Sequence, residues 1–157
     1  MVRNILVYPD SFLSRRAAPV SKIDEQLRKL IKDMFETMYE SEGIGLAATQ
    51  VGVDKRVIVL DVSSSDESGA PMALINPEIV GSEGAATVVM EGCLSVPGVR
   101  GEVIRPETVL VHGLNEDGEP VMLRADGILA RALQHEIDHL DGVLFIDRIP
   151  PSSATAE

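Results

Sequence analysis

The sequence is poor in aromatic residues, cysteine and positive charge. It has no tryptophan, 3% aromatic residues and a single cysteine, which excludes an internal disulfide framework and favours a reducing compartment such as the cytoplasm. Its 14 Lys and Arg against 25 Asp and Glu leave a net charge of −11. Such a surface repels phosphate backbones and offers few rings for base stacking, so we expect no nucleic-acid partner.

Long apolar segments are also missing. No run approaches the roughly 18 residues that a membrane span needs, and the first ten residues, MVRNILVYPD, lack the apolar stretch of a signal peptide. We therefore expect no membrane association. The 157 residues suffice for one domain with its own core. We expect a single catalytic domain over residues 1–149 and, because PPSSATAE is small and polar, a disordered tail over residues 150–157.

Two amphipathic segments predict helices. Apolar residues recur at helical spacing from about Ser21 to Tyr39, with Ser21 as the expected cap. A second helix is predicted from about Gly127 to Leu140, capped by Asp126, and its apolar residues cover most of its circumference, as in a buried helix.

Short β-rich runs separated by turn residues lie between these helices. One run spans residues 56–62 and ends in the polar turn SSSDESG, and others follow from residue 72 to a hairpin turn at residues 115–118. The pattern predicts an α+β fold in which short antiparallel sheets pack around a buried C-terminal helix that carries the metal site.

That second helix contains the pattern H-E-x-x-H. His135 and His139 are one turn apart, so both rings can reach one ion, and Glu136 is placed to reach a water beside it. Buried ionisable groups are costly unless something compensates them, and a metal ion would do so. The ordinary alternative is a helix with two core histidines and a salt-bridged glutamate.

A catalytic metal site needs a third protein ligand. Cys93, in VMEGCLSVPG, would bind well as a thiolate, although a lone cysteine is most often a small buried apolar residue. His112 is the other possible third ligand, but it alternates within a strand-like run and is predicted to be a surface residue. Asp138 and Asp141 stay open as ligands, although Asp138 is predicted to lie on the side of the helix away from the histidines.

The glycine-rich segment GIGLAATQVG follows the first predicted helix. It is no phosphate loop, because no Gly-Lys-Ser/Thr follows and no strand precedes it. Gln50 is its one side chain with both donors and acceptors, so it is either a functional group or part of a helix stop with a close packing contact.

Three segments together resemble the peptide deformylase family. Its motifs G-x-G-L-A-A-x-Q, E-G-C-L-S and H-E-x-D-H are matched in order by residues 43–50, 91–95 and 135–139. The resemblance covers residues 1–149. It implies an enzyme that removes the N-formyl group from the formylmethionine of newly made proteins and releases formate.

The resemblance also implies roles for individual residues. Cys93, His135 and His139 match the family's metal ligands, and Glu136 matches the catalytic glutamate. Gln50 and the backbone N–H of Leu94 match the groups that hold the formyl oxygen. Substrate-binding positions of the family fall on Ile44, Gly45, Val89, Gly92, Arg100, Ile128 and Ala132. For Arg131 the sequence leaves open whether the head group enters the pocket or points to solvent.

The implied cofactor is one divalent metal ion per chain, Fe(II) in the cell, with zinc, nickel or cobalt in the purified protein. The implied partners are N-formylmethionyl peptides of nascent chains. Ribosome contact is in doubt, because the net charge is −11 and no basic C-terminal helix is present.

Two other functions share the H-E-x-x-H helix. A zinc endopeptidase or aminopeptidase would need a His or Glu ligand after His139, but the 18 following residues contain no His and no Glu before Glu157. A metal-stabilised protein without activity would need neither Glu136 nor Gln50.

Overall fold

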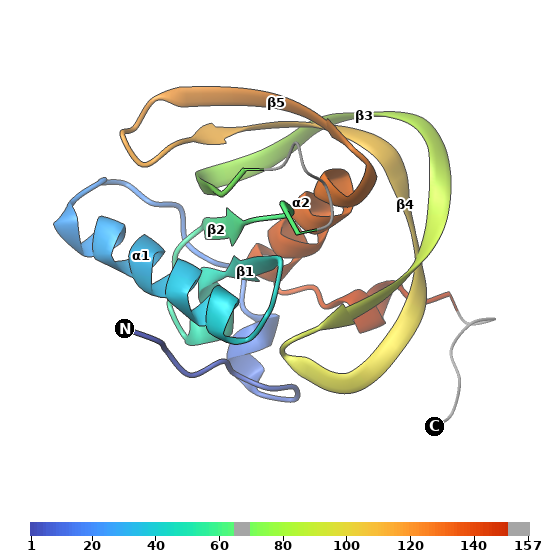
Figure 1. Cartoon of the computed structure of the whole chain (residues 1–157), viewed down its shortest axis with the longest axis horizontal. Helices are drawn as coiled ribbons and strands as arrows, with labels where there is room; N and C mark the ends of the chain where they lie inside the picture. Colours follow the sequence, from blue (N-terminus) through green and yellow to red (C-terminus); the bar gives the residue numbers. More distant parts are fainter. Residues whose placement is uncertain (65–69, 151–157) are drawn as a thin grey trace.

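The computed structural model describes residues 1–64 and 70–150 of the chain (Figure 1). Its helices are α1 (Glu25–Glu40) and α2 (Gly127–Leu140), with short 3-10 turns η1 (Ser11–Ser14), η2 (Ala48–Val51) and η3 (Phe145–Arg148). Its strands are β1 (Gly45–Ala47), β2 (Val57–Leu60), β3 (Met72–Cys93), β4 (Val96–Leu114) and β5 (Pro120–Asp126). The mixture of helices with antiparallel strands agrees with the predicted class.

The strands form one antiparallel sheet of five in the order β1-β2-β3-β4-β5, not several short sheets. The short runs expected between residues 72 and 114 are parts of two long strands, β3 and β4. Pro77, Gly81 and Gly84, which look like turn residues in the sequence, fall at register shifts within the β3–β4 pair. Such irregularities bend a strand without ending it, and Figure 1 shows both strands curving past α2.

The two helices cover opposite faces of β1 and β2. All four residues of β2 are buried: Val57 and Val59 pack in the cluster that contains α1, while Ile58 and Leu60 pack with α2. A strand covered on both faces reads as a continuous apolar run, which is why VIVL shows no alternation. The sheet therefore holds α2 in the interior of the molecule.

The helix starts differ in detail from those predicted. Asp24, not Ser21, caps α1, because its side chain accepts a hydrogen bond of 2.9 Å from the backbone N–H of Leu27. α2 begins after Asp126 as expected, but the Asp126 side chain makes no capping hydrogen bond. The register of α2 is set instead by the packing of its buried face, which includes Leu133 and Ile137.

Part of the predicted chain organisation lies outside the described residues. The polar turn expected at residues 63–69 is described only to residue 64, and the predicted tail at residues 150–157 only at its first residue. Within the described ranges, none of the helices is long and apolar enough to cross a membrane.

The chain leaves α2 through a tight contact with η1. Gly142 has a φ of 77°, and a Cβ at this position would lie 2.7 Å from the carbonyl carbon of Ser14. Backbone cannot yield as a flexible side chain can, so the exit from α2 requires glycine both for its conformation and for this approach.

We expect Gly142→Ala to lower the free energy of unfolding by about 2–4 kcal/mol, because strain and overpacking add. Gly98 has a φ of 79° with nothing within 4 Å of its Cβ position, so Gly98→Ala isolates the strain and should cost only about 1 kcal/mol. Urea unfolding of both variants measures the difference. Equal losses would show that the contact with Ser14 has no energetic weight.

Candidate active site

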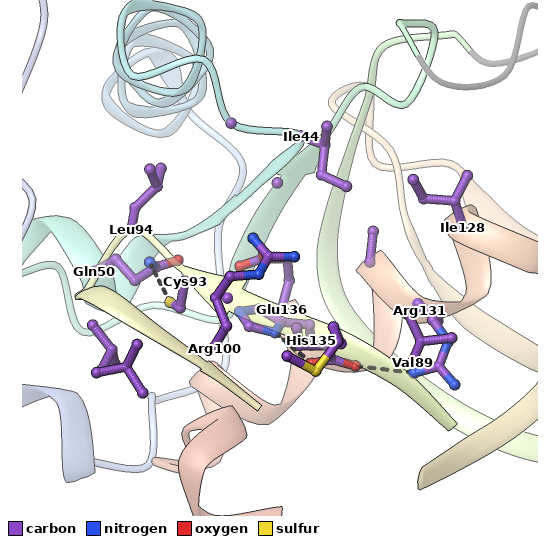
Figure 2. Close-up of a pocket in the computed structure, with 18 of the residues that line it drawn as sticks. Ile44, Gln50, Val89, Cys93, Leu94, Arg100, Ile128, Arg131, His135 and Glu136 are labelled. Atoms are coloured by element: carbon purple, nitrogen blue, oxygen red, sulfur yellow. Dashed lines mark hydrogen bonds and ion pairs between the residues drawn. The ribbon is translucent and has the colours of Figure 1, made fainter. Parts of the chain in front are cut away.

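One cavity of about 660 Å³ lies between the start of β1, the β3–β4 turn and α2. All the site residues predicted from the sequence line it except His139, which contacts Cys93 (Figure 2 shows the lining residues). Segments distant in the sequence therefore meet at this cavity. The fold brings the three sequence motifs to one place.

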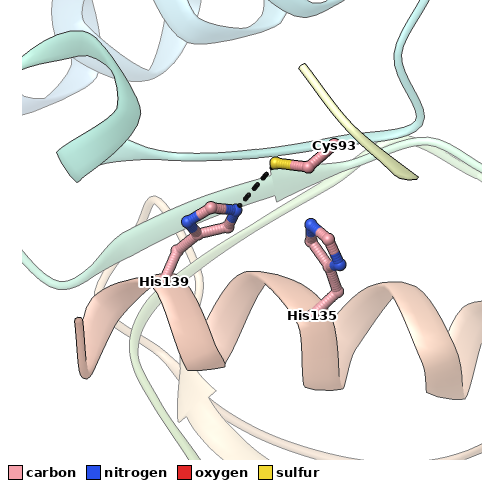
Figure 3. Close-up of side chains that lie close together, drawn as sticks. All are labelled: Cys93, His135 and His139. Atoms are coloured by element: carbon pink, nitrogen blue, oxygen red, sulfur yellow. Dashed lines mark hydrogen bonds between the residues drawn. The ribbon is translucent and has the colours of Figure 1, made fainter. Parts of the chain in front are cut away.

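Cys93, His135 and His139 form a compact cluster at the base of this cavity. One ligand atom from each lies within 4.8 Å of the others, and Cys93 Sγ is 3.2 Å from His139 Nε2 (Figure 3). The two histidines come from successive turns of α2, while Cys93 ends β3. His112 is exposed on β4, as predicted.

The cluster fits a divalent metal ion. A thiolate and two imidazoles are the donors that zinc and other transition metals prefer. Glu136 beside them is buried, and its Oε1 has no hydrogen-bond partner among the described residues. A buried carboxylate oxygen without a donor is costly, so this atom indicates a site for a water or a polar ligand next to the three donors.

Burial and charged neighbours shift the pKa values of the groups around the cluster. It raises the pKa of Glu136 to about 7 and lowers the pKa of His139 well below its usual value. Burial also acts to lower the pKa of His135, but contacts with Cys93 and Glu91 outweigh it and raise that pKa to about 10 in the absence of an ion. A carboxylate that titrates near neutral pH suits a proton-transfer role.

Gly45 lets the backbone of β1 approach this carboxylate. A Cβ at Gly45 would lie 2.7 Å from Glu136 Oε2, closer than a methyl group can be placed. The site therefore requires glycine at position 45. The sequence predicts a close backbone approach here, but it does not show which group the backbone approaches.

Gln50 is held rigidly beside Cys93. Its Oε1 accepts a hydrogen bond of 2.9 Å from the backbone N–H of Ala47, and its Nε2 donates to Ser95 Oγ at 3.1 Å. Nε2 also lies 3.7 Å from Cys93 Sγ. The amide hydrogens thereby lie beside the cluster of Cys93, His135 and His139. Leu94, in the turn between β3 and β4, lines the same part of the cavity.

The remaining predicted residues line the wider part of the cavity. Ile44 and Val89 come from the β1 and β3 sides, and Ile128 and Ala132 from α2. Gly92 and Arg100 are paired across β3 and β4. The Arg100 side chain is exposed and rises in front of the cavity in Figure 2.

A buried ion-pair network behind the cavity is what the sequence reasoning missed. Arg105 donates to both oxygens of Glu91 at 2.6 and 2.9 Å and to Asp138 at 3.0 Å. Glu91 Oε1 lies 3.1 Å from His135 Nδ1, which orients this imidazole. Arg148 adds a second pair with Asp138, which explains why Asp138 is not among the metal donors.

Weak signals of the network exist in the sequence. Glu91 interrupts the apolar run VVMEGC, and Arg105 stands in the strand-like EVIRPETV. Each residue alone resembles an ordinary surface charge. Only the β3–β4 pairing, which puts Glu91 and Arg105 on the same face above α2, shows that they are partners.

Comparison with known proteins agrees with this geometry. The model of the family "Polypeptide deformylase" matches residues 2–155. A peptide deformylase of Neisseria meningitidis is 55% identical over 146 residues, which are 93% of this chain and 86% of the relative. A peptide deformylase of Alkalilimnicola ehrlichii is 53% identical over 148 residues, which are 93% of this chain and 81% of that relative.

Solved structures of the family share the fold. The crystal structure of a peptide deformylase from Legionella pneumophila has a TM-score of 0.90 at 45% identity, covering 97% of this chain and 88% of that one. A Met-Ala-Ser-bound class I type b peptide deformylase from Acinetobacter baumannii has a TM-score of 0.89 at 38% identity. The match covers 95% of this chain and 99% of that one.

The fold and the matches place the chain among the hydrolases that act on amides. Within that class the chain belongs to the polypeptide deformylase family. It is an enzyme that removes the formyl group from an N-terminal formylmethionine.

Glu91→Gln should destabilise the protein by about 3 kcal/mol at pH 7, because Arg105 loses one of its two buried carboxylate partners. Burial acts to raise the pKa of Glu91, but Arg105 and His135 outweigh it and lower the pKa from its usual 4.5 to about 2. The stabilisation is therefore complete above about pH 5 and is lost as the pH falls toward 2.

Denaturant unfolding of the chelator-treated protein at several pH values measures this. The wild type should lose stability more steeply than Glu91→Gln between pH 5 and 2, and the two curves should converge. Parallel curves would mean that the Glu91 carboxylate contributes nothing through its charge.

Proposed function

We propose that this chain catalyses metal-dependent hydrolysis of the formyl amide, with the residue roles that the sequence motifs suggest. The observation that carries the proposal is the buried, unpartnered Glu136 oxygen beside the Cys93, His135 and His139 cluster at the base of an open cavity. This arrangement provides a proton acceptor next to three metal donors, at a place that a peptide can reach.

Cys93, His135 and His139 are the proposed ligands of one divalent ion. α2 supplies two of them and is thus the C-terminal helix that carries the metal site. When bound, such an ion lowers the pKa of water and polarises a carbonyl. We propose Fe(II) as the ion in the cell, with zinc, nickel or cobalt as substitutes, since thiolate and imidazole donors accept all of these.

Glu136 is the proposed general base and acid. Its buried carboxylate takes a proton from the attacking water and later gives it to the departing α-amine. A pKa near 7 supports both steps, because the group can accept and release a proton at neutral pH. The α-amine and formate are the products.

Gln50 and Leu94 are the proposed donors to the formyl oxygen as negative charge develops on it. Gln50 needs no reorganisation, because Ala47 and Ser95 already fix its amide. Each such donor is worth about 3–4 kcal/mol in comparable sites. The adjacent placement of Leu94 in the β3–β4 turn supports a backbone N–H as the second donor.

The apolar part of the cavity is the proposed site for the methionine side chain. Ile44, Val89, Ile128 and Ala132 supply its walls. Gly45 and Gly92 leave room for the peptide backbone, and Arg100 is at the mouth of the cavity. The Acinetobacter relative was solved with Met-Ala-Ser bound, a peptide that begins with methionine as the product would.

Three broader proposals follow from the sequence. Residues 1–149 form one catalytic domain, and residues 150–157 are a dispensable tail. The enzyme acts in the cytoplasm on nascent chains, because that is where formylmethionyl peptides arise. Its ribosome contact is weak, since a net charge of −11 opposes binding to an RNA surface.

Cys93→Ala should bind less than a tenth as much metal as the wild type while staying folded, because two imidazoles alone hold an ion weakly. His112→Ala, which removes an exposed histidine, should keep full metal content. Elemental analysis of purified proteins, with circular dichroism as the folding control, measures both. Stoichiometric metal in Cys93→Ala would refute the ligand assignment.

Glu136→Gln should reduce turnover of formyl-Met-Ala-Ser by about 10⁴-fold, because one residue supplies both proton transfers. Metal content and peptide affinity should stay close to those of the wild type, since the substitution conserves size. Formate release, metal content and affinity are measured on one preparation, with exposed Glu116→Gln as the matched control. Turnover within tenfold of the wild type would exclude the general-base role, and absent formate release from the wild type would refute the proposed function.

A further inference from the structure

Arg131 occupies a wall of the proposed methionine pocket that is otherwise apolar. It lies on α2 between Ile128 and Ala132 and one turn before His135, on the face that lines the cavity. Its side chain is only 13% exposed, and Figure 2 shows it on the same side of the cavity as Ile128. The head group therefore turns inward, which resolves the orientation that the sequence leaves open.

The guanidinium group of Arg131 is held in place by β3 and β4. Its Nη2 donates to the backbone oxygen and to Oγ1 of Thr87 at 2.6 and 2.7 Å. Its Nη1 donates to Glu91 Oε2 at 3.2 Å and to the Val103 oxygen at 3.4 Å. The fifth N–H, on Nε, has no acceptor within residues 1–64 and 70–150.

Arg131 is not required to neutralise Glu91. Arg105 already binds both oxygens of that carboxylate, at 2.6 and 2.9 Å. The ion pairs around Glu91 and Asp138 join three guanidinium groups to two carboxylates. The wall of the cavity thus carries a guanidinium group that is fixed in place and has one N–H that no described residue accepts.

We propose that Arg131 makes the side-chain pocket receptive to an unbranched side chain of methionine length that ends in a neutral hydrogen-bond acceptor, so that the enzyme also deformylates formylmethionine sulfoxide peptides. This inference rests on the proposed function. A sulfoxide oxygen accepts a hydrogen bond strongly, whereas a wholly apolar pocket would reject it because the oxygen would be desolvated without a donor. A carboxylate is a poorer fit, because Glu91 lies 3.2 Å from the same guanidinium group.

The test compares two peptides, formyl-methionine-sulfoxide-Ala-Ser and formyl-norleucine-Ala-Ser, in wild type and Arg131→Met. Norleucine has the length of methionine without an acceptor. The quantity measured is the ratio of kcat/KM for the sulfoxide peptide to kcat/KM for the norleucine peptide. Loss of metal or of folded protein reduces both values equally and leaves the ratio unchanged, so the ratio isolates the pocket from the structural role of Arg131 beside Glu91.

We expect Arg131→Met to lower this ratio at least tenfold, because a site that hydrogen-bonds a polar group discriminates strongly once the donor is removed. Arg124→Met, at an exposed arginine of β5 paired with Glu83, is the matched control and should leave the ratio unchanged. A smaller fall in Arg131→Met, or an equal fall in Arg124→Met, overturns the inference.

Two further results separate the inference from the proposed function. If Arg131→Met does not fold, Arg131→Leu takes its place with the same tenfold criterion, since leucine likewise has no hydrogen-bond donor. If the wild type releases no formate from formyl-Met-Ala-Ser, the proposed function is wrong and the inference falls with it. If the wild type cleaves the norleucine peptide and the ratio is insensitive to residue 131, only the inference fails.

Discussion

The ion pair between Glu91 and Arg105 is the interaction on which the site depends. Both side chains are buried, at 8% and 3% exposure, and they join adjacent strands above α2. Through the contacts of Arg105 with Asp138 and of Glu91 with His135, the pair connects both long strands to α2. Buried charges tolerate little displacement, because separation leaves them unsolvated, so the network positions α2 relative to Cys93.

The bends in β3 and β4 give this network its location. A straight strand of the length of β3 would carry Cys93 away from the helix. The register shifts near Pro77, Gly81 and Gly84 let the strand pair curve around α2 instead. Cys93 then ends β3 next to His139, and the following turn places Leu94 at the cavity. Residues that look like loop signals in the sequence serve to shape one continuous strand pair.

Rigidity is a common property of the residues around the reaction centre. Gln50 is fixed by Ala47 and Ser95, and His135 is oriented by Glu91. Among the described residues of this group, two buried polar atoms have no hydrogen-bond partner, Oε1 of Glu136 and Nδ1 of His139. A buried polar atom without a partner is costly, so a bound water or polar ligand would complete this otherwise fixed arrangement. Arg131 extends the same principle to the side-chain pocket, where a held guanidinium group faces apolar walls.

Local sequence determined a substantial part of this protein. The spacing of His135 and His139 brings two metal donors together on any helix, and the apolar periodicity places α1 and α2 within a few residues of their true bounds. The glycines of the first motif also predict that the backbone approaches another group closely. These features depend on a few neighbouring residues, so they can be derived without the fold.

Tertiary structure decided the rest. Without the family motifs, the sequence leaves four candidates for the third ligand. The fold brings Cys93, at the end of β3, into one cluster with the two histidines, a cluster that does not include His112, Asp138 or Asp141. No local pattern predicts four further features: the partners of Glu91, the inward orientation of Arg131, the contact between Gly45 and Glu136, and the continuity of β3. The physical reason is that these interactions join residues far apart in the chain. Their energies depend on distance and burial, and both are set only when the sheet has wrapped around α2.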